Sequence, residues 1–95
     1  MVMAGRVCIV SGGNSGIGFE LCRGMADAGF HVVMVSRGAE RGQPALEKLQ
    51  AEFGDSVEMM LCDMSDLGNI SKLHAEFTAK FDRLDVLLNN AGAMW

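Results

Sequence analysis

The sequence predicts an α/β fold in which helices cover both faces of a doubly wound parallel sheet. Short apolar runs alternate with longer segments whose apolar residues recur every three or four positions. The apolar runs are nearly continuous, which is typical of parallel strands that are buried on both faces. Right-handed crossovers between such strands favour the order 3-2-1-4.

Four apolar runs are the expected strands, at residues 6–11, 31–35, 57–62 and 84–88. In the predicted order the fourth strand is an open edge, and the sequence contains no later run to cover it. A long apolar edge favours pairing with another chain or aggregation. We therefore expect a sheet that is truncated after its fourth strand, with self-association through this edge as one consequence; a small domain that tolerates the edge is the alternative.

Three amphipathic segments between the strands are the expected helices. The first spans about 16–28 and places four apolar residues on one face: Ile17, Leu21, Met25 and Ala28. The second spans about 44–53, because Pro44 suits a first helical turn, where its missing N–H would be unpaired in any case. The third spans about 67–81, and either Ser65 or Asp66 would cap it.

Composition and charge exclude several classes of protein. The 95 residues make at most one small domain, and 49% hydrophobic with 21% charged residues is typical of a globular chain. A net charge of −4 without any Lys/Arg cluster argues against nucleic acid and anionic membranes as partners. No membrane-spanning run and no signal-peptide pattern is present, so a cytoplasmic location is expected.

The cysteines predict buried, reduced thiols. There are three, without a C-x-x-C pair, and Cys8 and Cys62 lie within apolar runs. An odd number of this kind does not suit a disulfide scaffold. No cluster of His, Cys and Asp has the spacing of metal ligands, so no metal site is expected.

A glycine-rich segment, Ser11-Gly12-Gly13-Asn14-Ser15-Gly16-Ile17-Gly18, joins the first expected strand to the first expected helix. Backbone N–H groups and the positive end of a helix dipole are what a dinucleotide pyrophosphate needs. Six residues are therefore the expected phosphate contacts: Gly12, Asn14, Ser15, Gly16, Ile17 and Gly18. A plain glycine-rich turn is the alternative. The context predicts a Rossmann-type fold, with residues 1–95 forming an incomplete dinucleotide-binding half-domain.

The spacing of these glycines resembles the T-G-x-x-x-G-[IL]-G pattern of the short-chain dehydrogenase/reductase family, with Ser11 in place of the threonine. Two further family motifs follow in order, in the segments 62–67 (C-D-M-S-D-L) and 89–92 (N-N-A-G). The resemblance covers essentially the whole chain but only the amino-terminal part of a typical member. Asn14-Ser15 and the run 35–37 are most similar to the retinol-dehydrogenase-like and carbonyl-reducing branches.

Ser36 and Arg37 indicate which dinucleotide is preferred. An NAD enzyme commonly has a carboxylate at the end of the second strand, where it bonds the ribose 2′-OH. Here Ser36 stands at that point and Arg37 follows. A guanidinium would bind a 2′-phosphate through charge-assisted bonds, and the serine could add a hydroxyl donor. We therefore expect NADP(H) over NAD(H), with an ordinary solvated arginine as the alternative.

The resemblance implies further contacts to the adenosine half of the cofactor. The carboxylate of Asp63 would accept from the adenine amino group, with the backbone of Met64 alongside; a loop or capping aspartate is the alternative. Three residues would lie along the ribose: Asn90, Ala91 and Gly92. Asn89 would brace the sheet instead, through its amide and neighbouring backbone.

The resemblance also implies hydride transfer, for which the family uses a serine and a Y-x-x-x-K pair. This sequence has no tyrosine, and none of its residues matches those catalytic positions. His31 and His74 are expected to be structural or solvated. No catalytic residue is assigned, and the 95 residues alone are predicted to be inactive.

The predicted function is therefore the NADP(H)-binding segment of an oxidoreductase that acts on an alcohol or carbonyl substrate. The substrate pocket would lie in the half of the enzyme beyond these residues. The alternatives are a nucleotide-binding module that stands alone or is completed by a partner, and a nonfunctional truncated product. A Rossmann binder of S-adenosylmethionine is a further alternative, against which the N-N-A-G motif counts.

Overall fold

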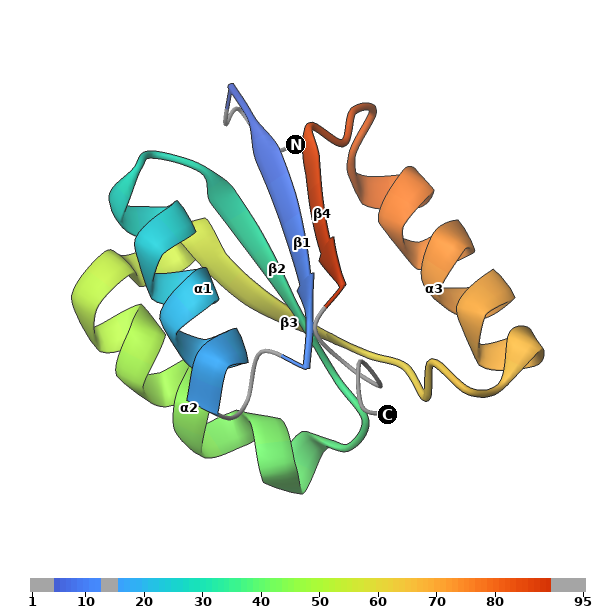
Figure 1. The fold of residues 1–95 in the computed structure, drawn as a ribbon. Coiled ribbons are helices and arrows are strands. Elements are labelled where there is room, and N and C mark those ends of the chain that lie inside the picture. Colours follow the sequence, from blue (N-terminus) through green and yellow to red (C-terminus); the bar gives the residue numbers. More distant parts are fainter. Residues whose placement is uncertain (1–4, 13–15, 90–95) are drawn as a thin grey trace.

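The computed structural model describes residues 5–12 and 16–89 of the chain. In these residues one parallel sheet has the order β3-β2-β1-β4, which confirms the predicted order. Its strands are β1 (Val7–Ser11), β2 (His31–Ser36), β3 (Val57–Leu61) and β4 (Val86–Asn89). The helices are α1 (Gly16–Asp27), α2 (Ala39–Phe53) and α3 (Leu67–Lys80), with a 3₁₀ turn, η1 (Gly54–Ser56). Helices α1 and α2 cover one face of the sheet and α3 the other (Figure 1).

The two central strands carry the core. Every residue of β1 and β2 is buried, as expected for strands with helices on both faces. Strand β4 alternates between half-buried and exposed residues, and Leu87 is 57% exposed. Among the described strands β4 pairs only with β1, so this edge of the sheet is open in that part of the chain.

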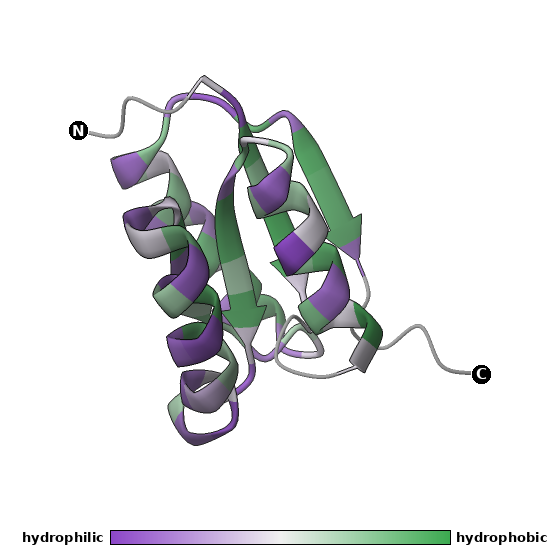
Figure 2. Ribbon diagram, turned by 90° about the vertical axis from the view of Figure 1, so that its left-hand side faces the viewer, coloured by the Kyte–Doolittle hydropathy of each residue, from purple (hydrophilic) through white to green (hydrophobic). Residues whose placement is uncertain are grey.

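Alternate side chains of the central strands enter two separate apolar layers. Cys8 and Val10 face α1 and α2, whereas Val7 and Ile9 face α3. Leu73 and Phe77 of α3 fill the second layer, and Phe81 joins them. In Figure 2 the strands are apolar over most of their length, and each helix carries polar residues.

The inner face of α1 differs from the prediction. The buried residues are Gly18, Cys22 and Ala26, with Leu21 and Met25 partly buried beside them. The expected members Ile17 and Ala28 are exposed, Ile17 by 73%. Small residues four positions apart let the helix lie close to the sheet, so the large residues flank the contact instead of centring it.

Helix α2 begins five residues earlier than predicted, at Ala39 rather than Pro44. The N–H of Gly42 donates to the carbonyl of Gly38 at 3.1 Å and closes the first turn. Pro44 therefore lies inside the helix, where its ring removes one backbone hydrogen bond. Both Pro44 and its acceptor residue Glu40 are exposed, so water can replace that bond.

The cysteines are confirmed as buried free thiols. Burial raises the pKa of Cys8 to about 11, and burial together with Cys8 raises the pKa of Cys22 to about 12. Thiols with such values are poor nucleophiles at neutral pH. Within residues 5–12 and 16–89, no helix is long and apolar enough to span a bilayer.

Candidate cofactor-binding site

The carboxyl ends of the parallel strands meet at one edge of the sheet. We call it the carboxyl edge, and it is distinct from the open edge along β4. Gly12 follows β1, Arg37 follows β2 and Asp63 lies just beyond β3, while Asn89 ends β4. The amino end of α1 lies at the same edge (Figure 1). In open parallel sheets ligands bind at this edge, outside the strand ends. The predicted cofactor residues that the structure describes therefore share one side of the molecule.

Two glycines on either side of residues 13–15 have backbone conformations that favour glycine. Gly12 has φ 70° and Gly16 has φ 42°, which side chains rarely allow. A Cβ placed at Gly16 would meet no atom of the described chain within 4 Å, so the space around it is open. Gly18 is buried on the sheet side of α1.

The amino end of α1 is accessible. Gly16 and Ile17 are both exposed there, and the first turn of the helix carries no acidic side chain that would repel an anion. Asn14 and Ser15, the other predicted phosphate contacts in this segment, lie outside the described residues.

Ser11 and Asn89 link the ends of β1 and β4. The buried hydroxyl of Ser11 donates to Asn89 Oδ1 at 2.9 Å. Asn89 thus braces the sheet, as predicted, but its partner is a side chain rather than backbone. The hydroxyl at position 11 explains why a serine suits this place in the glycine motif. Asn90, Ala91 and Gly92 lie outside the described residues.

Ser36 and Arg37 lie in different surroundings at the end of β2. Ser36 is 1% exposed, and its hydroxyl donates to the carbonyl of Gly38 at 2.9 Å. The side chain of Arg37 is 65% exposed. In this structure the serine therefore stabilises the turn into α2, and the arginine is the group that an anion at this edge would meet.

Gly42 sets the distance between α2 and the end of β2, a role that sequence reasoning missed. It is buried in α2, and a Cβ there would overlap the Met59 sulfur and lie 2.9 Å from Ser36 Cβ. Any side chain would push the helix away from the strand. The sequence predicts a helix that begins at Pro44, so Gly42 falls outside it and its place in the helix gives no signal.

Asp63 is held in one orientation beside Arg37. Its Oδ1 accepts from the Ser65 backbone at 3.0 Å and from the Ser65 hydroxyl at 2.7 Å, and its Oδ2 lies 3.8 Å from Arg37 Nε. The hydrogen bonds from Ser65, with a smaller contribution from the charge of Arg37, hold the pKa of Asp63 below its ordinary value. The carboxylate is therefore ionised at neutral pH.

The loop after β3 is fixed by local hydrogen bonds. Asp66, rather than Ser65, caps α3, and accepts from the N–H groups of Gly68 and Asn69. Asn69 Oδ1 accepts from the Asp63 N–H at 3.4 Å, while the Asp63 carbonyl accepts from the Asp66 N–H at 3.0 Å. Met64 is half-buried against the apolar layer under α3. The motif C-D-M-S-D-L thus folds as a rigid turn.

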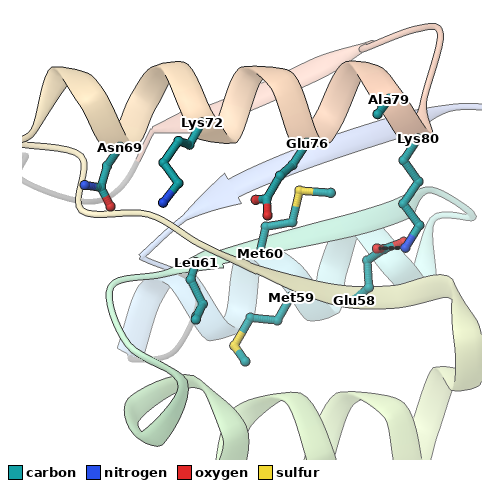
Figure 3. Close-up of a pocket in the computed structure, with 9 residues that line it drawn as sticks. All are labelled: Glu58, Met59, Met60, Leu61, Asn69, Lys72, Glu76, Ala79 and Lys80. Carbon is teal, nitrogen blue, oxygen red and sulfur yellow. Dashed lines mark hydrogen bonds and ion pairs between the residues drawn. The ribbon is translucent and has the colours of Figure 1, made fainter.

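A depression of about 750 Å³ lies between β3 and α3, away from the glycine-rich segment. In Figure 3, Lys72, Glu76 and Met60 point into this space, whereas Met59 and Leu61 point toward α2. No group of three His, Cys, Asp or Glu residues in the described part of the chain is arranged to hold a metal ion. The charged residues that line the depression are two carboxylates, Glu58 and Glu76, and two lysines, Lys72 and Lys80.

The histidines have the structural and solvated roles that the sequence predicts. His31 is buried, and its Nε2 lies 2.6 Å from Glu58 Oε2, while Lys80 donates to Glu58 Oε1 at 2.6 Å. His74 is exposed on α3. His31 begins β2 and therefore lies at the opposite end of the strand from the carboxyl edge, and His74 lies within α3.

Comparison with known proteins decides the family. A family model described as short chain dehydrogenase matches residues 6–95. The chain belongs to the short-chain dehydrogenase family. Among curated relatives, a (+)-neomenthol dehydrogenase of Capsicum annuum is 43% identical over 90 residues, covering 92% of this chain and 29% of that relative.

Solved structures of short-chain dehydrogenases share the fold. A menthone neomenthol reductase from Mentha piperita has a TM-score of 0.86 and 41% identity, over 92% of this chain and 31% of that one. Pseudomonas aeruginosa RhlG, described in an NADP active-site complex, has a TM-score of 0.85 and 34% identity, over 98% of this chain and 36% of that one. The chain thus spans about a third of the length of these short-chain dehydrogenases.

Proposed function

We propose that this chain is the NADP(H)-binding segment of an oxidoreductase that transfers hydride between a nicotinamide and an alcohol or carbonyl carbon. The observation that carries the proposal is Arg37, an exposed cation at the carboxyl end of β2, where the last residue of the strand is Ser36 and not a carboxylate. The dinucleotide, when bound, supplies the hydride carrier, and this segment supplies binding and orientation.

Two groups of residues would hold the cofactor. The pyrophosphate would lie at the amino end of α1, against Gly12, Asn14, Ser15, Gly16, Ile17 and Gly18, where backbone N–H groups and the helix dipole favour an anion. The adenosine half would lie toward β2 and β3, against Ser36, Arg37, Asp63, Met64, Asn90, Ala91 and Gly92. The positive φ of Gly12 and Gly16 and the accessible start of α1 support this placement.

Electrostatics favours a cofactor with a 2′-phosphate. A carboxylate at the end of β2 would accept from a ribose 2′-OH and repel a phosphate, and Ser36 has no charge. Arg37 offers several N–H donors in one plane, which match phosphate oxygens. Relatives of known structure include Pseudomonas aeruginosa RhlG with NADP and a metagenomic short-chain oxidoreductase in complex with NADP, at 34% and 32% identity.

The test compares NADPH and NADH binding to the wild-type chain, Arg37→Asp and Arg41→Asp. Charge-assisted bonds to the 2′-phosphate predict that the wild type binds NADPH about 10- to 100-fold more tightly than NADH. Arg37→Asp should abolish or reverse this ratio. Arg41→Asp is the matched control, since it changes the same charge on the exposed side of α2 and should keep the preference. Tighter binding of NADH by the wild type contradicts the proposal.

A nucleotide-binding module without catalysis is the second candidate, and the exposed edge of β4 favours it because another chain could pair there. The dehydrogenases and reductases among the relatives favour the enzyme segment instead. Either way, the lack of tyrosine predicts that these 95 residues show no NADPH oxidation with a ketone. Measurable turnover would contradict the assignment of binding alone.

A further inference from the structure

Asp63 is the acid that faces Arg37. Among the described residues it supplies the one carboxylate within 4.0 Å of the guanidinium, and the two side chains come from neighbouring strand ends. Ser65 occupies Oδ1 with two hydrogen bonds, so Oδ2 is the oxygen directed at Arg37. The contact therefore follows from a fixed loop and not from two freely moving side chains.

The backbone of Asp63 is fixed as firmly as its carboxylate. Its N–H and its carbonyl both have partners in the turn that leads into α3, Asn69 and Asp66. Asp66 is itself the cap of that helix. Arg37, in contrast, is largely exposed and has a long flexible stem, so it is the partner that moves.

We propose that Asp63 limits the preference for NADP over NAD, because its carboxylate competes with the 2′-phosphate of the cofactor for Arg37. The inference rests on the proposed function, since it takes Arg37 as the 2′-phosphate ligand. The competition requires that the guanidinium moves its Nε away from Oδ2 when it turns toward a phosphate. An exposed ion pair of this kind is weak, so the competition should change the preference only a few-fold.

The experiment measures the ratio of two dissociation constants, those of 5′-AMP and of adenosine 2′,5′-bisphosphate, by calorimetric titration of the chain. The two probes share the adenine, so any direct contact of Asp63 with the base cancels in the ratio. Asp63→Asn keeps an oxygen that can accept from Ser65 but removes the charge. We expect this variant to raise the ratio by about two- to fivefold in favour of the bisphosphate.

The effect of Asp63→Asn is also measured in an Arg37→Met variant, which distinguishes competition for Arg37 from a direct effect on the phosphate. Without the guanidinium the carboxylate of Asp63 and the 2′-phosphate share no ligand, so adding Asp63→Asn to Arg37→Met should leave the ratio unchanged. Asp55→Asn is the matched control, because it removes the same charge from the exposed turn η1 at the opposite edge of the sheet. It should not change the ratio in either background.

Three results would overturn the inference. A ratio that falls in Asp63→Asn would mean that Asp63 positions Arg37 for the phosphate. A rise that persists in the Arg37→Met background would mean direct repulsion of the phosphate without competition. A wild-type ratio that Arg37→Met leaves unchanged would remove the NADP proposal and this inference together, whereas the first two results leave the NADP proposal standing.

Discussion

Three serines at the carboxyl edge each donate a hydrogen bond from the side-chain hydroxyl, but to different acceptors. Ser11 donates to Asn89 and joins β1 to β4, Ser36 donates to its own turn, and Ser65 donates to Asp63. Each bond fixes backbone or a neighbouring side chain. Arg37 is an exposed cation at this edge, which is why we propose that it sets the cofactor preference.

The residue types of the site could be predicted from the sequence, but several partners could not. Gly12 and Gly16 have the positive φ angles that a glycine-rich turn favours, and Asn89 braces the sheet as expected. The sequence offers the Ser36 hydroxyl as a donor to a phosphate, and in the structure this hydroxyl donates to the carbonyl of Gly38. Whether a hydroxyl at a strand end turns inward depends on the path of the next helix, which local sequence patterns do not reveal.

Gly16 offers a direct test of the phosphate site. Gly16→Val should abolish dinucleotide binding and leave helical content largely unchanged, because valine is strained at φ 42° while space for the side chain is available. Gly24→Val is the control: it lies on the exposed side of α1 with nothing within 4 Å. Cofactor fluorescence and circular dichroism measure the two effects, and unchanged affinity in Gly16→Val would rule this turn out.

At the scale of elements, the start of α2 and the inner face of α1 differ from the prediction, whereas α1 and α3 begin where the sequence predicts. Pro44 is a good signal for a first turn, yet α2 begins at Ala39, because Gly42 allows the helix to continue close against β2. In α1 the small residues Gly18 and Cys22 face the sheet instead of Ile17. The early start of α2 and the inner face of α1 both depend on close packing between elements. The periodicity of the sequence indicates only where large apolar residues recur.

Three elements are joined at the opposite edge by Glu58 of β3, which contacts His31 of β2 and Lys80 of α3. Burial raises the pKa of Glu58, but the hydrogen bonds from Lys80 and His31 outweigh burial, so the pKa lies below its ordinary value of 4.5. A carboxyl whose pKa is lower in the folded state stabilises that state above its unfolded pKa. The stabilisation is lost as pH falls through the folded value.

Glu58→Gln should therefore lower the free energy of unfolding by about 1–2 kcal/mol at pH 7, as expected for the loss of charged hydrogen bonds that are partly screened. The difference from wild type should shrink toward zero at pH 3. Urea titrations at both pH values measure it. Glu76→Gln, exposed on α3, is the control and should match the wild type at each pH. A difference that is equal at pH 7 and pH 3 would show that the charge of Glu58 is not responsible.

At the scale of the molecule, the order β3-β2-β1-β4 could be predicted because handedness and chain order leave few choices for alternating strands and helices. The same order puts the glycine turn, Arg37 and Asp63 on one edge, and the Glu58 cluster on the other. The proposed cofactor site and the contacts that brace β2, β3 and α3 therefore lie at opposite ends of the strands.

Titration of the ¹⁵N-labelled chain with NADP, followed by amide chemical shifts, tests the central claim most directly. The account predicts that the largest shifts occur at the carboxyl edge, at Gly12, Gly16, Arg37, Asp63 and Met64. The amide chemical shifts of Glu58 and Lys80, at the opposite edge, should not change. Shifts concentrated in the depression between β3 and α3, or no saturable shift at the carboxyl edge, would contradict it.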